Sequence, residues 1–368
     1  MVESDDPSAL IQIHLIQHST RLPHPLAFSP VVDVCILKDT YGAPMVNAAI
    51  SGGNLALVIS TAYYWKGDLS VWNWRTGVKK GEVHVPEPRV GIHFLREDLL
   101  LNGNLTDMSL DTYRTLEPNS TSCSGMETEE NKSIINHVQL VHRFGLPQIK
   151  ENHYETTEIF CHSQPSCSLP SSQKTNLPFT SDPLSAILLI EVGIRRDEWG
   201  SENFRKFTFI MHRRTLLNLT LDVVDSPKKD SSEIDRVPWA AWGPNSTRML
   251  ADDFTDLNCL TAVIGTRCIW LHGPHLEVLD FGSPNTKPQA MPKEDNVSDA
   301  DGVQVHLVDT ESIYPAGRGP FTQDVQTYLP YVSSSRLVSL GEKSWKGVFM
   351  DDEKIVGFTK KFLHILHL

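Results

Sequence analysis

Short apolar runs separated by Gly, Pro, Asn and Asp fill the chain from Val31 onward. Such runs, bounded by turn residues, are typical of the strands of an all-β protein. Val31–Leu37 predicts a strand, and Val46–Ile50 and Leu55–Ile59 predict a hairpin. No long segment keeps the 3.6-residue period of an amphipathic helix, so helices are expected to contribute little. Further short β segments are expected at Ala186–Val192, Phe207–His212, Thr215–Leu221, Trp239–Leu250, Leu260–Leu271, Val303–Leu307 and Tyr328–Val338.

The segment Asp68–Val83 carries the clearest hairpin pattern. Leu69, Val71, Trp72 and Trp74 are branched or aromatic residues that suit a pleated, half-buried surface. Arg75-Thr76-Gly77 then supplies a tight turn, with glycine where a positive φ is needed. The sequence therefore predicts a hairpin that resembles half of a propeller blade.

Parts of this pattern recur along the chain. Val90–Leu101 and Gly347–Val356 share an apolar strand ending near Phe, a charged turn and a second apolar strand. Leu69–Trp74, Leu276–Phe281 and Leu363–Leu368 share one alternation, at separations close to five and two periods of a blade of roughly 40 to 45 residues. A repeat of that period predicts a β-propeller.

Three stretches interrupt the pattern, at residues 117–183, 225–236 and 282–302. They are rich in Ser, Pro, Lys, Asp and Asn and are expected to be loop insertions. Residues 1–30 form a poorly defined N-terminal segment, in which Leu10–Ile16 fits a strand or a short helix. The rest predicts a single β-propeller over residues 31–368, with about six to seven four-stranded blades.

Composition excludes several classes of function. The 368 residues are 40% hydrophobic and 21% charged, which suits a globular chain with a sizeable core. The net charge of -12 disfavours binding to nucleic acid. No apolar run approaches the roughly 20 residues of a membrane span, and the acidic start is unlike a signal peptide. We expect an intracellular protein, cytoplasmic or nuclear.

The cysteines and the Asn-x-Ser/Thr triplets give no functional site. Six thinly spread cysteines predict reduced thiols: Cys35, Cys123, Cys161, Cys167, Cys259 and Cys268. Cys161-His162, Cys167 and His153 suggest zinc ligands, but the paired Cys-x-x-Cys knuckles are missing, so no metal is predicted. Six triplets occur, headed by Asn104, Asn119, Asn131, Asn218, Asn245 and Asn296, and are read as ordinary Ser/Thr-rich loops and strands.

Two acidic clusters and one acidic loop are candidate sites. Asp252-Asp253 with Asp256, and Asp351-Asp352-Glu353, offer paired carboxylates of the kind that glycoside hydrolysis uses, although solvated turn charges explain the second cluster. Asp295–Gly302 resembles a calcium loop, but valines fall at the first and last ligand positions, so a flexible acidic loop is favoured.

No phosphate-binding glycine loop, nucleophile elbow or His-Glu-x-x-His motif is present. Arg195-Arg196 and Arg213-Arg214 are expected at strand ends, where they meet an acidic partner or discourage edge pairing. Six tryptophans on strands are expected in the core between blades: Trp72, Trp74, Trp239, Trp242, Trp270 and Trp345. The sequence therefore predicts no catalytic, cofactor-binding or metal-binding residue and no cofactor, and leaves the partner-binding residues unknown.

Several segments carry a family resemblance. They are Val32–Pro44, Val71–Gly77, Phe207–Arg213, Trp239-Ala-Ala-Trp-Gly-Pro-Asn-Ser-Thr-Arg248, Val263-Ile-Gly-Thr-Arg267, Tyr328–Tyr331 and Phe349–Val356. From Val31 to Leu368 the chain resembles a large fungal family of F-box-associated propeller proteins of mushroom-forming basidiomycetes. The resemblance implies a WD40-like or quinoprotein-like propeller that presents partners to a cullin-RING ubiquitin ligase. The F-box itself is not recognisable, because β pattern begins at Val31, soon after Leu22-Pro23.

The expected function is a non-enzymatic protein-interaction module, similar to the substrate-receptor part of such an F-box protein. A protein client is expected at the loop face or the channel mouth, and the Skp adaptor and cullin only where an F-box lies upstream. One alternative is a propeller enzyme, either a quinoprotein-like oxidoreductase or a glycosidase, since fold does not fix function. Another is a degenerate paralogue that lacks the F-box.

Overall fold

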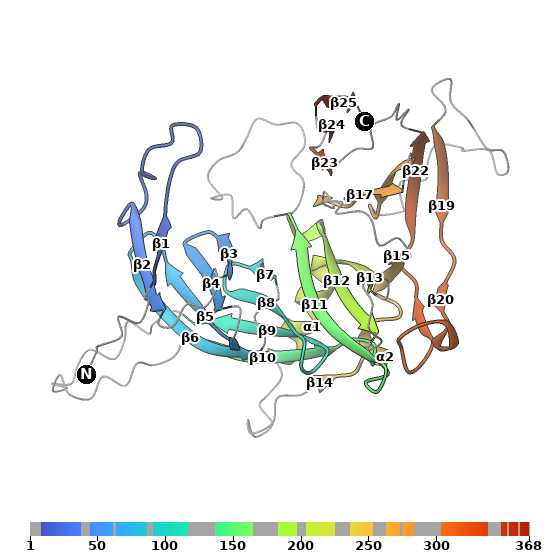
Figure 1. Cartoon of the computed structure of the whole chain (residues 1–368), viewed down its shortest axis with the longest axis horizontal. Coiled ribbons are helices and arrows are strands. Elements are labelled where there is room, and N and C mark those ends of the chain that lie inside the picture. The colour runs from blue at the N-terminus through green and yellow to red at the C-terminus, as the bar shows by residue number, and fades with distance from the viewer. Residues whose placement is uncertain are drawn as a thin grey trace, which may run out of the picture. The chain divides into compact units, whose positions relative to one another are not determined.

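The computed structural model describes residues 9–37, 45–61, 64–86, 91–116, 137–164, 183–196, 204–224, 236–252, 263–272, 275–282, 303–337, 347–351, 353–359 and 361–367. The chain divides into two compact units. Unit 1 comprises Met1–Arg143, Pro165–Ser171 and Ser226–Arg236. Unit 2 comprises Phe144–Gln164, Ser172–Asp225 and Val237–Leu368. Both units consist mainly of antiparallel sheets (Figure 1).

Unit 1 contains two sheets whose strands pair in chain order. The first has the order β3 (Met45–Ser51), β4 (Asn54–Thr61), β5 (Tyr64–Asn73) and β6 (Val78–Pro86). The second has β7 (Ile92–Arg96), β8 (Leu99–Asn104), β9 (Ser109–Thr115) and β10 (Val138–Gly145), with the short β14 (Arg236–Val237) beside β10. A two-stranded sheet pairs β1 (Ala9–His14) with β2 (Val31–Leu37).

Unit 2 also consists of antiparallel sheets, one of which departs from chain order. Its first sheet has the order β11 (Tyr154–Ser163), β12 (Ile187–Arg196), β13 (Phe204–His212) and β15 (Thr247–Asp252). The second has β16 (Val263–Ile264), β17 (Arg267–His272), β18 (His275–Asp280), β22 (Tyr331–Leu337) and β19 (Gln304–Val308). The third has β23 (Gly347–Met350), β24 (Lys354–Phe358) and β25 (Leu363–His367), and β20 (Ser312–Tyr314) pairs with β21 (Val325–Thr327).

The predicted all-β fold is confirmed, and most neighbouring strands in its sheets are consecutive along the chain, as in the up-and-down blades of a propeller. The sequence repeats occupy equivalent places in these sheets. Leu69–Trp74, Leu276–Phe281 and Leu363–Leu368 coincide with β5, β18 and β25, each the third strand of its sheet. Val90–Leu101 and Gly347–Val356 coincide with β7–β8 and β23–β24, each the first hairpin. The number of blades and the single domain over residues 31–368 stay predictions.

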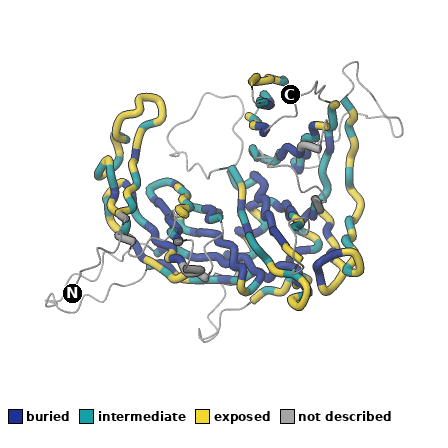
Figure 2. The backbone as a smooth tube through the Cα atoms, in the orientation of Figure 1, coloured by how far each residue is buried: buried dark blue, intermediate teal, exposed yellow. Residues whose placement is uncertain are grey.

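Central strands are buried on both faces. In β4, Leu55 and Leu57 belong to one apolar cluster, while Ala56 and Val58 belong to another on the opposite face. The first cluster includes residues of β1, β2 and Trp74, and the second includes residues of β7–β9. The same alternation occurs in unit 2, where Cys268 and Ile269 of β17 enter different clusters. Figure 2 shows the buried strands in dark blue.

The β5–β6 hairpin has the predicted turn. The side-chain Oδ1 of Asn73 accepts hydrogen bonds from the backbone N–H groups of Arg75 and Thr76, at 3.1 and 3.2 Å. Gly77 follows with a φ of 74° and donates its N–H to the carbonyl of Asn73 at 2.8 Å. Trp74 is buried, and its indole N–H donates to the carbonyl of Gly52. The turn is thus fixed by Asn73 and by the left-handed conformation of Gly77.

One predicted β segment is a helix. Thr215–Leu221 lies within α1 (Arg213–Val224), so the strand prediction there is wrong. The buried face of α1 includes Leu216, Leu217 and Thr220, at helical spacing. The segment Trp239–Leu250 likewise begins with a helical turn, α2 (Trp239–Trp242), before β15.

Other boundaries also change. Within the predicted insertion at residues 117–183, β10 and β11 are strands, so the loop prediction is wrong there. The described part of the N-terminal segment has more structure than predicted. Of the two alternatives for Leu10–Ile16, a strand or a short helix, the structure has the strand, β1. Residues 225–235 and 283–302 lie outside the described residues. Two short 3₁₀ turns, Pro183–Ser185 and Ala316–Arg318, complete the elements. Within the described ranges, no helix has the length and hydropathy of a membrane span.

We predict that Gly77→Ala destabilises the hairpin. A non-glycine residue at this φ costs about 1–2 kcal/mol, and a Cβ built on Gly77 would lie 2.6 Å from the ring of Phe28. The free energy of unfolding should fall by at least that amount in urea denaturation. Gly317→Ala is the matched control, because a Cβ there meets nothing within 4 Å. Equal effects of the two substitutions would contradict the strained turn.

Candidate functional site

A buried carboxylate with a lysine and a histidine partner lies on β11–β13 of unit 2. Glu191 of β12 is opposite Phe160 of β11 and Thr208 of β13. Two residues further along β12, Gly193 is opposite Glu158 and Lys206 of the same two strands. Residues directly opposite one another, and residues two apart on a strand, share a face of the sheet.

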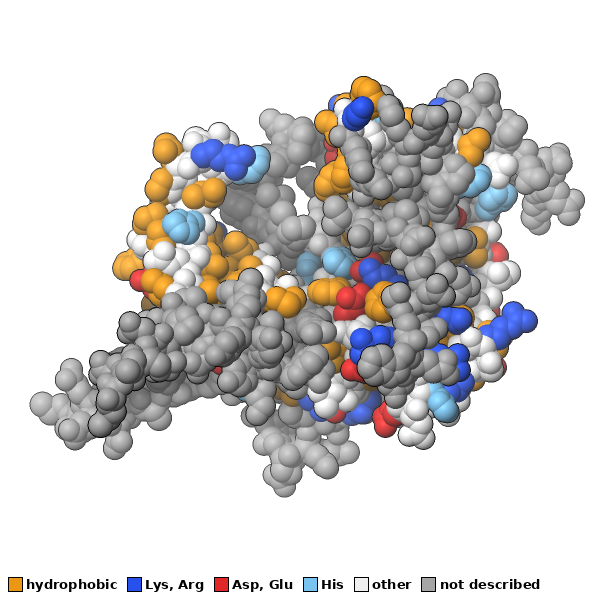
Figure 3. All heavy atoms as spheres, viewed as in Figure 1, with side chains coloured by type: hydrophobic (Ala, Val, Ile, Leu, Met, Phe, Trp, Pro, Cys, Tyr) orange, Lys and Arg blue, Asp and Glu red, His pale blue; other side chains and the backbone are white. Residues whose placement is uncertain are grey.

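His162 shares this face, because it lies two residues beyond Phe160 on β11. We call Glu158, His162, Glu191 and Lys206 the Glu191 site. In Figure 3, acidic, basic and histidine side chains lie next to one another over β11–β13. The register therefore gathers two carboxylates, a lysine and a histidine that are far apart in sequence.

Glu191 is the fixed centre of the site. Its side chain is only 7% exposed, and its Oε2 lies 2.9 Å from Lys206 Nζ and 3.2 Å from His162 Nε2. Burial alone would raise the pKa of Glu191, but the hydrogen bond from His162 and the charge of Lys206 outweigh burial and lower it to about 2. The carboxylate therefore stays ionised, while its two partners are partly exposed and available to another molecule.

Glu158 has the opposite shift. Burial, and to a lesser degree the negative charge of Glu191, raise the pKa of Glu158, whereas Lys206 opposes this rise. The side chain of Glu158 crosses Gly193, where an added Cβ would lie 2.5 Å from Glu158 Cγ. Glycine at this position therefore makes room for the second carboxylate. The site thus holds two carboxylates with pKa values pushed apart.

Thr208 completes the buried part of this face. It is opposite Glu191 on β13 and is fully buried. Its hydroxyl has no hydrogen-bond partner within the described residues. A buried hydroxyl without a hydrogen bond costs free energy. The side-chain polar groups here are therefore less completely hydrogen-bonded than the backbone of the paired strands.

A second candidate is an apolar patch on unit 1, formed by Leu22, Leu26, Phe28 and Val78. We call it the Phe28 patch. All four side chains are more than half exposed, with Phe28 at 73%. Phe28 lies against Gly77, next to Val78, so the patch covers the turn of the β5–β6 hairpin.

The segment that carries the Phe28 patch is held at several points. The N–H of Leu15 donates to the carbonyl of Pro30 at 2.8 Å, and the N–H of Gln17 donates to that of Leu22 at the same distance. The ring of His24 meets the ring of Trp74 edge-on, with centroids 5.0 Å apart. The exposed apolar side chains are therefore presented by a fixed backbone. Large apolar side chains that are exposed on a fixed backbone are candidates for an interaction site.

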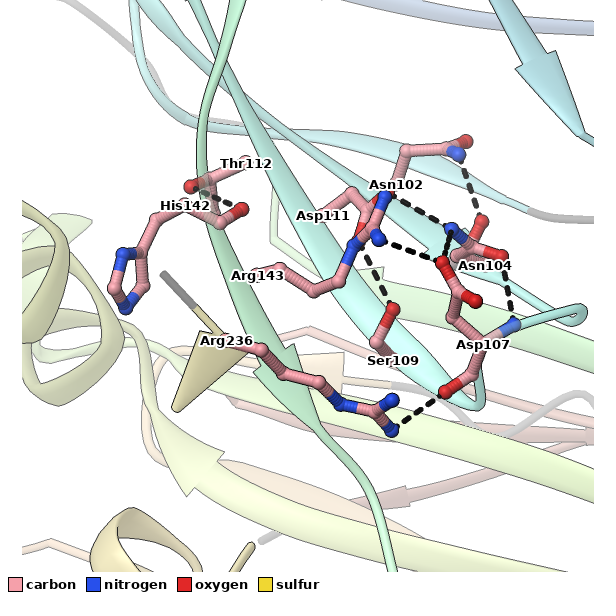
Figure 4. Close-up of polar contacts among 10 residues, drawn as sticks. Asn102, Asn104, Asp107, Ser109, Asp111, Thr112, His142, Arg143 and Arg236 are labelled. Atoms are coloured by element: carbon pink, nitrogen blue, oxygen red, sulfur yellow. Dashed lines mark hydrogen bonds and ion pairs between the residues drawn. The ribbon is translucent and has the colours of Figure 1, made fainter. Parts of the chain in front are cut away.

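A second polar cluster, on β8–β10, is structural (Figure 4). The guanidinium of Arg143 donates to both carboxylate oxygens of Asp111, at 2.9 and 3.1 Å, and lies 2.7 Å from Asp107. Asp111 also accepts from Ser109 Oγ and Asn104 Nδ2. Asp111 is fully buried and has four donors, so the cluster holds the β8–β9 turn to β10 and leaves no carboxylate oxygen for a ligand.

The acidic candidates from the sequence do not form a site in the described residues. Asp351 lies in the β23–β24 turn, where its Oδ1 accepts from the backbone N–H groups of Glu353 and Lys354 at 2.8 and 2.6 Å. That carboxylate therefore stabilises a turn, as the solvated-turn interpretation predicts. Asp252 ends β15. Asp253, Asp256, Asp352 and the loop Asp295–Gly302 lie outside the described residues.

The cysteine and histidine candidates do not converge. Cys161 and His162 are neighbours on β11, so their side chains face opposite sides of the sheet. Burial raises the pKa of Cys161 to about 12 and also raises that of Cys268. Cys35, Cys161 and Cys268 are free thiols, as predicted; Cys123, Cys167 and Cys259 lie outside the described residues. No group of three His, Cys, Asp or Glu suited to a metal is found in the part of the chain that the structure describes.

The arginine pairs behave differently from each other. Arg195 is exposed at the end of β12 and pairs with Glu155 at 2.7 Å, as expected for a strand end. Arg213 also lies at a strand end, directly after β13, but the expected role is wrong, because Arg213 begins α1 and is fully buried. Its guanidinium donates to the carbonyls of Pro183 and Gln164 and to Ser163 Oγ. Arg213 therefore fixes α1 against the strand ends and is not available to a partner.

The tryptophans follow the core prediction in part. Trp74, Trp242 and Trp270 are buried, as predicted. Trp72 and Trp239 are partly exposed, and Trp345 lies outside the described residues. Trp242 donates its indole N–H to the carbonyl of Gly145 at 3.0 Å, and its ring meets Phe144 edge-on. These aromatic residues are structural.

The Glu191 site and the Phe28 patch were both missed in the sequence. Glu191 sits inside the apolar run Ile187–Ile194, where a single carboxylate is a signal for a buried, paired charge. The sequence does not indicate the partners of Glu191, because the pairing register of β11 and β13 with β12 brings them from other strands. The signal for the patch was available: Leu22, Leu26 and Phe28 are apolar residues in a proline-rich segment with little capacity to form regular structure.

Comparison with known proteins identifies no family. No family model and no curated protein matches the chain. Among solved structures, the WD40 domain of SCAP from fission yeast is similar at 9% identity, with a TM-score of 0.32, over 92% of this chain and 62% of that one. Hsv2p of Kluyveromyces lactis is similar at 12% identity and a TM-score of 0.27, over 63% and 54% of the two chains.

A third solved structure, from an analysis of two prolyl endopeptidases, is similar at 11% identity and a TM-score of 0.34, over 90% of this chain and 33% of that chain. The chain thus spans less than two thirds of the length of each of these structures. Similarity at these levels assigns neither activity nor partner. The function has to be argued from the sites themselves.

We predict that Glu191→Gln changes the pH dependence of stability. The folded pKa of Glu191 is about 2 against an ordinary value of 4.5, so its contribution is fully present above 4.5 and is lost as pH falls toward 2. This difference corresponds to at most about 3 kcal/mol. Urea unfolding should show the variant less stable than wild type at neutral pH, with the gap closing toward pH 2. Glu155→Gln, at an exposed pair, should show almost no gap, and a pH-independent gap for Glu191→Gln would contradict the assignment.

We predict that Asp111→Asn destabilises the β8–β10 sheet strongly. The substitution removes the more buried of the two carboxylates that pair with Arg143 and leaves this partly buried cation with Asp107 alone, at a cost of about 3 kcal/mol. Asp98→Asn is the control on the same sheet, because Asp98 and its partner Arg96 are each about one third exposed. That control should cost about 1 kcal/mol or less. Similar losses in urea denaturation for both variants would show that the Asp111 cluster has no special role.

Proposed function

We propose that this chain is a protein-interaction module made of propeller blades and that the Phe28 patch is its client-binding surface. The observation that carries this proposal is the exposure of four large apolar side chains on a backbone that is already fixed. Binding through such a surface loses little conformational entropy, because few groups have to be ordered. A polar ligand would gain nothing from these side chains, so the client is a protein with a complementary apolar surface.

The family resemblance extends the proposal. In that family the propeller presents partners to a cullin-RING ubiquitin ligase, and we propose the same receptor role for this chain. The Skp adaptor and the cullin would be reached through an F-box joined to it. The client-binding step depends on the Phe28 patch alone, so it is tested separately from the ligase role.

A glycosidase is the second candidate, and the Glu191 site is what favours it. Two carboxylates with pKa values pushed apart are the usual acid and base of glycoside hydrolysis. However, Glu191 is buried, and its Oε2 is engaged by both Lys206 and His162. A substrate would have to displace both partners to reach it. We therefore rank this candidate below the interaction module and propose that the chain is not an enzyme.

The test is quantitative affinity purification with Leu26→Ser/Phe28→Ser. We expect wild type to recover a client near one-to-one stoichiometry and the variant to lose it by about tenfold or more, the loss expected when anchor side chains are removed. Leu307→Ser is the matched control, because Leu307 is similarly exposed but lies on β19 of unit 2. Equal recovery by all three proteins, or no stoichiometric client for wild type, would overturn the proposal.

The ligase role has its own readout in the same experiment. We expect the Skp adaptor and a cullin among the proteins recovered with a version of the chain joined to an F-box, together with the client. Recovery of the client without either protein would leave the interaction module in place and remove the receptor role.

A further inference from the structure

The side chain of Asn104 is enclosed in the polar cluster at the end of β8 (Figure 4). Its exposed fraction is 0%. Its Nδ2 donates to Asp107 Oδ2 at 3.2 Å and to Asp111 Oδ2 at 3.0 Å, and its Oδ1 accepts the backbone N–H of Asp107 at 3.1 Å. An asparagine amide nitrogen has two hydrogens. Both are used here, inside the protein.

The same residue begins the triplet Asn104-Leu105-Thr106, which is an acceptor for N-linked glycans. A glycan replaces one of the two hydrogens on Nδ2 and is a bulky group that needs an open path to solvent. At Asn104 neither condition is met, because both hydrogens are donated and the side chain is buried. The folded turn and a glycan at this position exclude each other.

The consequences spread beyond one hydrogen bond. Asn104 shares Asp111 with Arg143 and Ser109, and it shares Asp107 with Arg143. Moving the Asn104 side chain out of the cluster would take a donor away from the carboxylates of Asp107 and Asp111. A buried polar group that loses its partner costs more free energy than the hydrogen bond contributes when it is formed. A modified Asn104 would therefore disrupt the packing of the β8–β9 turn against β10.

The other described triplets do not have this property. Asn218 lies on the exposed face of α1, and Asn245 lies in the exposed turn before β15. Asn119, Asn131 and Asn296 lie outside the described residues. Among the described triplets, the conflict between modification and folding is therefore specific to Asn104.

We propose that Asn104 must stay unmodified for this chain to fold, and that the fold therefore forms only in a compartment that lacks oligosaccharide transfer. The transfer acts on the chain before it folds, so burial of Asn104 in the finished structure gives no protection. The inference rests on the geometry of the β8–β9 turn and is independent of the proposed client.

The test directs the full chain through the secretory pathway of a eukaryotic host with a cleavable signal peptide. Wild type is compared with Thr106→Ala, which removes the acceptor triplet and leaves Asn104 in place. Thr106 is exposed, so the same variant made in the cytosol should keep the wild-type melting temperature. In the secretory route we expect a glycan on Asn104 of wild type by peptide mass spectrometry. We also expect several-fold less protease-resistant wild type than Thr106→Ala, because lost stability lowers abundance in cells.

Asn245→Gln is the matched control, because it removes a different, exposed acceptor and should give no rescue. Secreted, protease-resistant wild type that carries a glycan on Asn104 would overturn the proposal. So would a Thr106→Ala variant recovered no better than wild type, or a wild-type chain that passes through the pathway without any glycan on Asn104.

Discussion

The need to bury both faces of each central strand organises this protein. In β4, alternate residues enter two separate apolar clusters, one shared with β1–β2 and Trp74 and the other with β7–β9. A sheet that is apolar on both faces needs a neighbouring sheet on each side, and successive antiparallel meanders along the chain supply those neighbours. A buried carboxylate needs hydrogen-bond donors or charged partners, which explains why Asp111 and Glu191 occur in tight polar clusters.

Local chemistry made part of this fold predictable. The Asn73–Gly77 turn could be placed because only a few residue types adopt its backbone, and the structure has the left-handed φ at Gly77 that the sequence required. The repeats were informative for a similar reason: β5, β18 and β25 hold the same position in their sheets and so carry the same alternation. Patterns of period two, read over several sheets, therefore identified the blades, although they did not fix how many there are.

The sequence was less informative where contacts between distant strands decide the outcome. Thr215–Leu221 is a short apolar run with two β-prone threonines, yet it folds as part of α1 because Leu216, Leu217 and Thr220 can share one buried face only in a helix. Arg213 looked like a surface charge because its three acceptors lie near Ser163 and Pro183, far away along the chain. Glu191 shows the same limitation, since the register of β11 and β13 supplies its partners.

The two buried carboxylates, Asp111 and Glu191, differ in a way that separates structure from function. Asp111 is met by donors from Arg143, Ser109 and Asn104, so both of its carboxylate oxygens are engaged by hydrogen bonds. Glu191 is compensated by Lys206 and His162, both partly exposed, and its neighbour Thr208 has a hydroxyl without a partner in the described part of the chain. A carboxylate whose hydrogen bonds are all made within the protein has no place for a further group. For the same reason its donor Asn104 has no hydrogen left for a modification. A ligand could reach Glu191 only by displacing Lys206 and His162, which are partly exposed, so the Phe28 patch, which needs no such displacement, is the better candidate for a binding surface.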